Sequence, residues 1–521
     1  MRKIFLTLLL ISCAGAAQAK VEVWTRSCLE PLVREAAPPE ILDKSISLRV
    51  TPGEYEPAVF AVRSDKPIAV TVSPSGLEGF DWLPAAWCEL HKVVGLSDST
   101  RPNRLFEFSG LVELKPGSTE FFWLTIRPPE NARPGIYNGR IFLQSVHEMQ
   151  QIEISCEVLP FRLAENPIPG GAFMAATNLP GCWYRDMKEH GLDAIQYFWA
   201  YEARVTRRGD KLVLDLSRMD DLMADLEASG MKGPVVISLG NDYHLHYERR
   251  IAEVFGIPID TSAVMDGKRI VGPKVSPRLD SLFVEGLRQI RDHWKAKAYP
   301  QELVVLIYDE PTERLLERCK NRYDLLKTVM PDTRVYGVVM DRREWARSMV
   351  DQCDIIVCNG DFAGCLDVAQ KYNKGFWVYG APLANAHTAR YDMGCLPWRV
   401  KAQGFFLWMY NYWDYDPDGC AVYRHPEDPD KPVRSVSWEA LREGMDDLRY
   451  FATAERLIER APEKKKTVFK KRLDQVRDSI EPEHRRRRPA GKTPGQMSLL
   501  EYYNEPQRVR NEVIEIILEL L

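Results

Sequence analysis

Eight short apolar runs alternate with helical patterns through the middle of the chain, and this alternation limits the fold more than any other feature. The runs occupy residues 172–174, 194–198, 234–239, 303–308, 335–339, 355–358, 375–379 and 404–409. Helical patterns separate several of them, at residues 220–229, 279–295, 315–329 and 342–349. Apolar strands joined through helices are typical of a parallel sheet that is covered on both faces. Eight such units predict a (β/α)8 TIM-like barrel over residues 170–433, with residues 243–274 as a long loop above its top face.

The segments on either side of the barrel follow different patterns. Before it, short alternating strand candidates with frequent turns occur at residues 46–50, 58–62, 68–72, 119–126, 140–143 and 152–158. They predict an N-terminal β-sandwich over residues 20–163, followed by a linker rich in Pro and Gly. After it, amphipathic patterns at residues 438–457, 464–480 and 501–521 predict a C-terminal helical segment over residues 434–521. The chain is therefore predicted to be multidomain.

The N-terminus has the pattern of an export signal. Arg2 and Lys3 precede an apolar core, and Ala17-Gln18-Ala19 is a small-x-small cleavage site, which predicts a signal peptide over residues 1–19. The apolar core is too short to span a membrane as a helix. Residues 10–13, ending in Cys13, also resemble a bacterial lipoprotein box. We expect an exported protein, periplasmic or extracellular, and lipid anchoring at Cys13 stays open as the alternative.

Charge and motifs exclude several classes of function. The formal net charge of −4 over 521 residues is too small to favour nucleic acid or an anionic membrane surface as a partner. The sequence has no phosphate-binding glycine loop, no dinucleotide fingerprint and no zinc-protease or serine-hydrolase motif. Its 9 His and 11 Cys are scattered without metal-ligand spacing. We therefore expect no cofactor, no metal ion and mostly buried free thiols.

Asp309 and Glu310 follow the fourth apolar run directly and precede Pro311. Taken alone, these three residues are also typical of a helix start, because acidic side chains suit the positive end of the helix dipole and proline fits the first turn. If the run is a barrel strand, the two carboxylates lie at its carboxyl end, where barrel enzymes keep their catalytic groups. Two carboxylates at that place favour acid/base chemistry on a glycosidic bond.

A dense cluster of rings follows the eighth run and is expected on the same face of the barrel. Aromatic rings stack on the apolar faces of sugars, while amides and acids bind sugar hydroxyls. The other interpretation is a barrel lid packed with aromatic side chains, but an amide at Asn411 among the rings favours a sugar site. The seventh run ends in rings in the same way. The predicted substrate contacts are Tyr308, Trp377, Tyr379, Trp408, Tyr410, Asn411 and Trp413.

Five motifs occur in a specific order along the chain. They are Tyr-Asp-Glu-Pro at residues 308–311, the ring-rich stretch 404–413, the helical stretch 438–447 and, in the first segment, residues 121–123 and 134–139. In their order and spacing they resemble glycoside hydrolase family 123, and the resemblance covers nearly the whole mature chain. It implies a β-sandwich that leads into a catalytic barrel, and an exo-acting β-N-acetylgalactosaminidase that acts on glycans.

The resemblance also implies a retaining, substrate-assisted mechanism, in which the oxygen of the sugar's own 2-acetamido group attacks the anomeric carbon. Asp309 would orient the acetamide N–H and stabilise the oxazolinium-like intermediate. Glu310 would protonate the leaving oxygen and then activate water. This scheme is one of the exceptions to the rule of two catalytic carboxylates.

The chain departs from the family pattern in two places. Residues 418–426 replace the Gly-Asp-Gly turn and Tyr-Pro-Gly that often follow the eighth strand, and residues 447–450 read Asp-Leu-Arg-Tyr where Asp-Tyr-Glu-Tyr is usual. These changes bear on sugar specificity and on the leaving-group side more than on the fold.

Two alternatives follow from the sequence. One is a glycosidase of the same fold that acts on a sugar without an acetamido group, with Asp414, Asp416 or Asp361 as the second carboxylate. The other is a carbohydrate-binding protein without catalysis, against which the intact pair of Asp309 and Glu310 argues.

Overall fold

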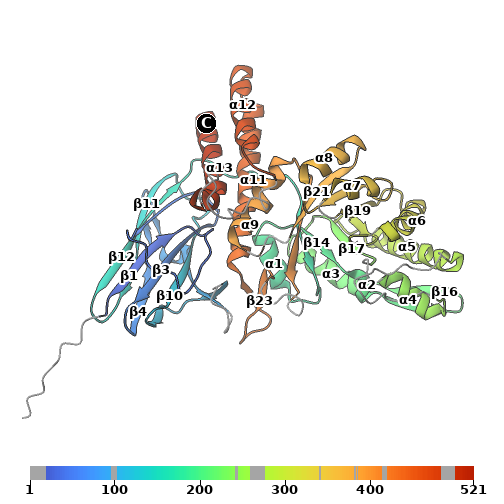
Figure 1. The fold of residues 1–521 in the computed structure, drawn as a ribbon, viewed down its shortest axis with the longest axis horizontal. Helices are drawn as coiled ribbons and strands as arrows, with labels where there is room; N and C mark the ends of the chain where they lie inside the picture. The colour runs from blue at the N-terminus through green and yellow to red at the C-terminus, as the bar shows by residue number, and fades with distance from the viewer. Residues whose placement is uncertain are drawn as a thin grey trace, which may run out of the picture. The chain divides into compact units, whose positions relative to one another are not determined.

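The fold is taken from a computed structural model (Figure 1). It describes residues 19–95, 103–240, 245–258, 276–311, 313–339, 342–380, 383, 385–412, 419–482 and 499–521. The predicted signal sequence up to residue 18, with Cys13, lies outside the described residues. The chain folds into two compact units. The first ends at Pro160, and the second runs from Phe161 to Leu521 and includes two short earlier pieces.

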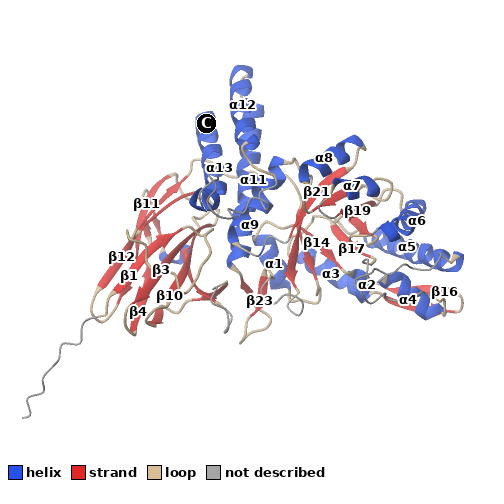
Figure 2. Ribbon diagram, viewed as in Figure 1, coloured by secondary structure: helices blue, strands red, loops and turns tan. Residues whose placement is uncertain are grey.

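The first unit is built of strands, as Figure 2 shows in red. One sheet has the order β1 (Val21–Arg26), β3 (Glu56–Ser64), β10 (Thr119–Ile126), β7 (Cys88–Val94) and β8 (Arg104–Glu107). The other has the order β2 (Ser45–Val50), β12 (Met149–Val158), β11 (Gly135–Gln144), β4 (Ile68–Pro74) and β9 (Leu111–Leu114), with β5 (Leu77–Glu78) and β6 (Trp82–Leu83) beside β11. Buried side chains of both sheets, such as Phe60, Phe122 and Ile141, share one core. The predicted β-sandwich is confirmed.

The second unit contains a closed barrel of eight parallel strands. They are β13 (Gly170–Met174), β14 (Ala194–Tyr197), β17 (Val235–Ser238), β18 (Leu303–Leu306), β19 (Arg334–Val339), β20 (Ile355–Cys358), β21 (Gly375–Gly380) and β22 (Phe405–Asn411). All eight coincide with the predicted apolar runs. Their short, continuously buried sequences fit strands that are covered on both faces.

Helices connect the barrel strands, and Figure 2 shows them in blue. They are α1 (Gly181–Glu189), α2 (Trp199–Glu202), α3 (Ser217–Ala228), α4 (His246–Phe255), α5 (Pro277–Lys297), α6 (Glu313–Val329), α7 (Arg343–Met349), α8 (Phe362–Lys371), α9 (Ala386–Arg390), a π-helical turn (Tyr391–Cys395) and α10 (Leu396–Arg399). Two features differ from the prediction. A hairpin of β15 (Arg204–Arg208) and β16 (Lys211–Asp215) precedes α3, and α4 lies inside the stretch that was expected to be a loop.

The barrel interior is filled by side chains that alternate along each strand. Val304 and Leu306 of β18 belong to the interior cluster, together with Tyr336, Trp377 and Phe406. Even-numbered residues of β18 therefore face inward. The seam between β13 and β22 is so tight that a Cβ at Gly170 would lie 2.3 Å from the Phe405 ring and one at Gly171 2.3 Å from the Phe406 ring, which explains why β13 begins with two glycines.

The C-terminal helices belong to the same compact unit as the barrel. They are α11 (Val436–Arg460), α12 (Glu463–Asp478) and α13 (Leu499–Leu520), and a short hairpin of β23 (Val422–Arg424) and β24 (Pro432–Arg434) precedes them. Asp447 of α11 accepts hydrogen bonds from Arg390 of α9 (2.8 Å) and from Arg510 of α13, all three being almost fully buried. Within the described ranges, no helix is both long and apolar enough to cross a membrane.

Candidate active site at the carboxyl end of the barrel

Asp309 and Glu310 lie just beyond the carboxyl end of β18, and both are half-buried. The backbone N–H of Asp309 donates to the carbonyl of Gly240, which follows the neighbouring strand β17, at 3.1 Å. Glu310 has a φ of +43°, a left-handed conformation that non-glycine residues rarely adopt. The chain therefore turns sharply at the carboxylate pair before α6 begins at Glu313. Strained backbone of this kind is concentrated at functional sites.

The carboxylate of Asp309 lies within electrostatic range of the barrel interior. Burial raises the pKa of the Tyr336 hydroxyl well above its usual range, and the nearby charge of Asp309 raises it further. Tyr336 is an interior residue of β19, so the charge of Asp309 acts on a group inside the barrel. The inward alternation of Val304 and Leu306, continued past the strand end, would place residue 308 inside as well.

Tyr308 points the other way. Its side chain is 2% exposed, and its hydroxyl donates to a carboxylate oxygen of Glu248 on α4 in the helix layer. Arg318 of α6 donates to the same hydroxyl oxygen at 3.2 Å. This placement corrects the prediction that Tyr308 contacts substrate, since the hydroxyl is already used and the ring is covered.

Aromatic rings line the same end of the barrel. The Phe173 ring of β13 lies 4.9 Å from Trp408, 5.2 Å from Phe198 and 6.1 Å from Tyr379, between ring centroids. The Trp408 ring lies 6.2 Å from Tyr412. All but Phe173 keep part of their surface accessible. We call Phe173, Phe198, Tyr379, Trp408 and Tyr412 the aromatic wall. Tyr379 and Trp408 were predicted as substrate contacts, and the other three were missed.

Two further rings that were predicted to contact substrate are buried. Trp377 is 1% exposed and fills the barrel interior between Tyr336 and Phe406, with each ring centroid 5.7 Å away. Tyr410 is fully buried on the outer side of β22, where its hydroxyl donates to Asp186 of α1 at 3.2 Å and to the carbonyl of Trp183 at 3.0 Å. The structure therefore corrects both predictions, because these rings pack the protein itself.

The side chain of Asn411 forms hydrogen bonds with two backbone groups of the protein. Its side-chain oxygen accepts from the N–H of Ala175 at 2.9 Å, and its amide group donates to the carbonyl of Ala176 at 2.9 Å. It joins the end of β22 to the chain after β13 and is 1% exposed. The sequence-based argument that an amide among rings serves a sugar is therefore corrected, since this amide closes the barrel seam. Trp413 lies outside the described residues.

Several buried polar groups in the barrel went unpredicted. Among the residues that the structure describes, no hydrogen-bond partner is present for the amide atoms of Gln196, the hydroxyl of Tyr336 or the side-chain oxygen of Asn359. Gln196 is on β14, Tyr336 on β19, and Asn359 follows β20. Buried polar groups of this kind normally bind water or a ligand. For Gln196 and Tyr336 the sequence signal was a polar group inside an otherwise apolar run, whereas Asn359 lies just after such a run.

The other candidate groups from the sequence do not add to this site in the part of the chain that the structure describes. Asp361 accepts from the Arg343 guanidinium at 3.0 Å, which argues against it as a second catalytic carboxylate. Asp414 and Asp416 lie outside the described residues. In the described part of the chain, no group of three or more His, Cys, Asp or Glu side chains could hold a metal ion. Ten cysteines are described there, all of them free, and eight of these are buried.

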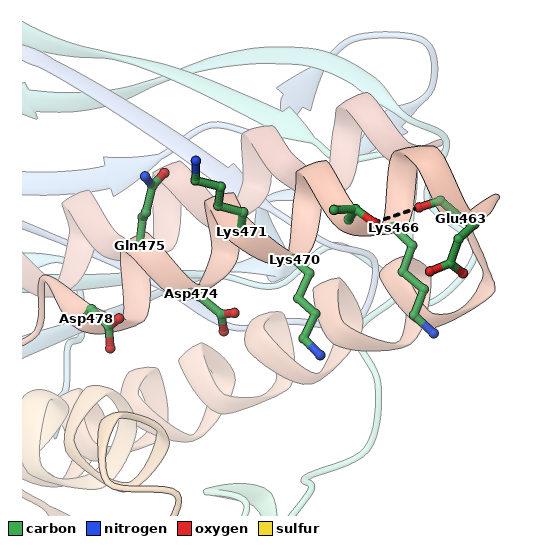
Figure 3. Close-up of a pocket in the computed structure, with 8 residues that line it drawn as sticks. Glu463, Lys466, Lys470, Lys471, Asp474, Gln475 and Asp478 are labelled. Atoms are coloured by element: carbon green, nitrogen blue, oxygen red, sulfur yellow. Dashed lines mark hydrogen bonds between the residues drawn. The ribbon is translucent and has the colours of Figure 1, made fainter.

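A surface hollow of about 560 Å³ occurs on α12 (Figure 3). Its lining comes from one helix and consists of charged and polar side chains, including Lys466, Lys470 and Asp474. None of the predicted site residues belongs to it.

The barrel end remains the candidate site, because it combines two carboxylates, accessible rings and unpartnered buried polar groups. In such a site, the carboxylates can give or take protons at the bond that is cleaved, while the rings stack on an apolar face of a hydroxylated ligand.

Comparisons with known proteins found one matching family model and several similar solved structures. Residues 259–454 match the sequence model of a family described as glycoside hydrolase 123, catalytic domain. No curated protein matches the chain. Among solved structures, a family 123 glycoside hydrolase from Clostridium perfringens, described in a study of glycolipid glycan hydrolysis, has a TM-score of 0.73 at 13% identity and covers 96% of this chain and 99% of that chain. At this identity the similarity shows a shared fold.

Two other glycosidases match less well. An endo-beta-1,4-mannanase from Thermotoga petrophila has a TM-score of 0.36 at 10% identity, over 55% of this chain and 77% of that chain. A family 5 mannosidase from Rhizomucor miehei has a TM-score of 0.37 at 12% identity, over 55% and 95%. The match to the family 123 model includes three of the five motifs, at residues 308–311, 404–413 and 438–447, and confirms the resemblance in this part of the chain.

Proposed function

We propose, from the match of residues 259–454 to the catalytic-domain model of glycoside hydrolase family 123, that the chain is a glycosidase and that it removes terminal β-linked N-acetylgalactosamine from glycans. The reaction proceeds with retention of configuration. The nucleophile is the oxygen of the substrate's 2-acetamido group, and the intermediate is an oxazolinium ion. No cofactor takes part.

The observation that carries this proposal is the placement of two consecutive carboxylates on one strand end. Retaining glycosidases with a protein nucleophile hold two carboxyl groups about 5–5.5 Å apart on opposite sides of the scissile bond. Asp309 and Glu310 are instead neighbours in sequence at a sharp turn, and the charge of Asp309 acts on Tyr336 inside the barrel. This arrangement supports one carboxylate at the acetamide and the other at the leaving group.

Asp309 accepts a hydrogen bond from the acetamide N–H, which turns the carbonyl oxygen toward the anomeric carbon. Its negative charge then stabilises the positive charge that develops on the intermediate. Glu310 donates a proton to the glycosidic oxygen as the bond breaks. In the second step, the same carboxylate removes a proton from the water that opens the intermediate.

The aromatic wall supplies a stacking surface for the sugar ring. Trp408 and Tyr379 keep accessible ring surface at the barrel mouth, and stacking on the apolar face of a sugar is the contact that such rings favour. Gln196, Tyr336 and Asn359 offer hydrogen-bonding groups within the barrel. We propose that they bind the buried end of the substrate, directly or through water.

We propose glycolipid glycans as the natural substrate class, on the strength of the similarity to the Clostridium perfringens enzyme. Export by the signal peptide is proposed from the sequence alone, since an exported enzyme meets such glycans outside the cell. The mass of the mature protein tests this. Cleavage after Ala19 is expected, whereas a lipidated Cys13 as the first residue indicates membrane anchoring.

The test of the function compares three chromogenic substrates. Purified protein is assayed on the 4-nitrophenyl glycosides of N-acetyl-β-galactosamine, N-acetyl-β-glucosamine and β-galactose. We expect cleavage of the first, with inhibition by the matching thiazoline and with the β-anomer as the first product. Cleavage of the plain galactoside at a similar rate contradicts assistance by the acetamide, and activity on none of the three contradicts the enzymatic assignment.

A further inference from the structure

A buried charged cluster lies directly behind the carboxylate pair, between α4 and α6. Glu248 is 2% exposed, and Arg322, which is fully buried, donates to its two oxygens at 2.9 and 2.8 Å. Arg318 donates to Glu248 as well and is 6% exposed. Asp280 of α5 accepts from the other side of Arg322. We call Glu248, Arg318 and Arg322 the Glu248 cluster.

The Glu248 cluster is ionised and tightly paired. Burial alone would raise the pKa of Glu248, but Arg322 and Arg318 outweigh that effect and hold it at about 2. Buried ion pairs of this kind seldom stabilise a fold more than apolar side chains of the same volume. Stability alone therefore does not explain why three charged side chains occupy this place, and a role in fixing local geometry is the better account.

The cluster holds the catalytic turn from both sides. Before the turn, the Tyr308 hydroxyl donates to Glu248. After the turn, Arg318 and Arg322 project from one face of α6, one helical turn apart, and bind the same carboxylate. The segment from Tyr308 to α6 is thus tied at each end to one buried acid on a third element.

Tying Tyr308 outward determines where the next two side chains point. Regular alternation along β18 would place residue 308 inside the barrel and residue 309 outside. With the Tyr308 hydroxyl bound in the helix layer, this alternation is broken just before Asp309, and Glu310 takes its left-handed φ. The Tyr308 hydroxyl binds Glu248 and Arg318, and both belong to the Glu248 cluster. Both hydrogen bonds therefore hold the Tyr308 side chain on the helix side of the barrel.

We propose that the hydrogen bond from Tyr308 to Glu248 positions Asp309 and Glu310 for catalysis, so that Tyr308 and Glu248 are positioning residues of the glycosidase. This inference rests on the proposed function for its kinetic consequences. Its structural consequence, the direction of Asp309, does not depend on which sugar is cleaved.

The first test uses Tyr308→Phe, which removes only the hydroxyl. We expect kcat to fall about 10- to 100-fold, as for misplacement of catalytic groups by a fraction of an ångström to one ångström, while KM changes less than about twofold because the aromatic wall is untouched. The loss should be larger for a methyl-type leaving group than for 4-nitrophenol, since proton donation by Glu310 matters most there.

Tyr323→Phe is the matched control. Tyr323 is also on α6, and its hydroxyl donates to the carboxylate of Asp354 at 3.0 Å, away from the catalytic turn. Both variants remove one tyrosine-to-carboxylate hydrogen bond, so similar decreases in Tm are expected. Only Tyr308→Phe should lower kcat. Equal kcat losses in the two variants overturn the proposal.

Glu248→Gln separates positioning from stability. The amide keeps an oxygen to accept from Tyr308, but it removes the negative charge that faces Arg318 and Arg322, while Asp280 still pairs with Arg322. We expect a larger decrease in Tm than for Tyr308→Phe and a smaller decrease in kcat. If the kcat losses follow the Tm losses instead, the role of the cluster is only structural and the proposal is overturned.

A measurement without substrate completes the test. Crystal structures of the wild type and of Tyr308→Phe should differ in the direction of Asp309 and in the φ of Glu310. An unchanged turn overturns the positioning role even if the enzyme is active. A changed turn in a protein that is inactive on all three glycosides supports the positioning role while the proposed function fails.

Discussion

The ends of β18 and β22 carry the two densest motifs of the chain, and they divide their side chains differently between the barrel mouth and the helix layer. At β18, the carboxylates stay at the mouth and the preceding Tyr308 is buried behind the barrel. At β22, Trp408 stays at the mouth, whereas Tyr410 and Asn411 bind protein groups. Each motif therefore combines side chains at the barrel mouth with side chains that bind other parts of the protein.

The difference lies in what holds each strand end. Behind β18, Glu248 and its two arginines, all from helices on the outside, hold Tyr308, the residue next to the carboxylate pair. At the end of β22, Asn411 binds the backbone next to β13, and Asp186, which is paired with Arg434, accepts from Tyr410 and Trp438. We expect changes at the first end to alter kcat and changes at the second to alter mainly stability.

The largest effect is expected for Glu310→Gln. Removing the proton donor should lower kcat/KM about 10³-fold on a substrate with a poor leaving group and clearly less on an activated one. Steady-state rates on the methyl and 4-nitrophenyl N-acetyl-β-galactosaminides check this. Equal losses on the two substrates mean that Glu310 is not the acid. The end of β18 would then not differ from the end of β22 in carrying the proton donor.

Asp309→Asn is expected to follow, with a loss of about 10²–10³-fold in kcat, because the charge facing the developing intermediate is removed. The thiazoline inhibitor should lose affinity in parallel. Asp361→Asn is the matched control, since that carboxylate pairs with Arg343. A loss of kcat in the control as large as that in Asp309→Asn contradicts the assignment.

Trp408→Ala tests the part of the β22 motif that remains at the mouth. Loss of a stacking ring should raise KM about tenfold and change kcat little, in line with roughly 1–1.5 kcal/mol for a ring contact. Initial rates over a range of substrate concentrations give both constants. An unchanged KM excludes Trp408 from the sugar-binding surface.

Asn411→Ala should act on stability rather than on the chemistry. It leaves the N–H of Ala175 and the carbonyl of Ala176 without their partners, which costs about 2 kcal/mol of unfolding free energy. Urea unfolding of the second unit measures the cost. If Asn411→Ala keeps wild-type stability but lowers kcat strongly, Asn411 belongs to the reacting groups after all.

The smallest effect is a pH dependence of stability from Glu248. Its pKa is about 2 in the folded protein, below the value of about 4.3 for an unfolded chain. A lowered folded pKa contributes stability above the unfolded pKa, and this contribution is lost as pH falls toward 2. Between about pH 4.5 and 2.5, the unfolding free energy of Glu248→Gln should therefore fall less steeply with decreasing pH than that of the wild type. The difference in slope corresponds to about one proton taken up on unfolding. Parallel slopes contradict the ionised cluster.

The sequence predicted the eight barrel strands because each is a short, continuously apolar run between polar helices. Helix α4 was missed because it is rich in charged residues and its buried positions, such as Tyr247 and Ile251, are few. The burial of Tyr308 was not predictable from local pattern, since its hydroxyl binds Glu248, 60 residues earlier in the chain. Likewise, the partners of Asn411 lie more than 230 residues before it in the chain.

The most direct test of the account is a crystal structure with the thiazoline derived from N-acetylgalactosamine, which imitates the oxazolinium intermediate. The account predicts a carboxylate oxygen of Asp309 about 2.6–3.2 Å from the thiazoline nitrogen, with Glu310 beside the anomeric carbon and Trp408 against the sugar ring. A thiazoline bound at the barrel mouth with Asp309 beyond hydrogen-bond reach of that nitrogen would contradict it.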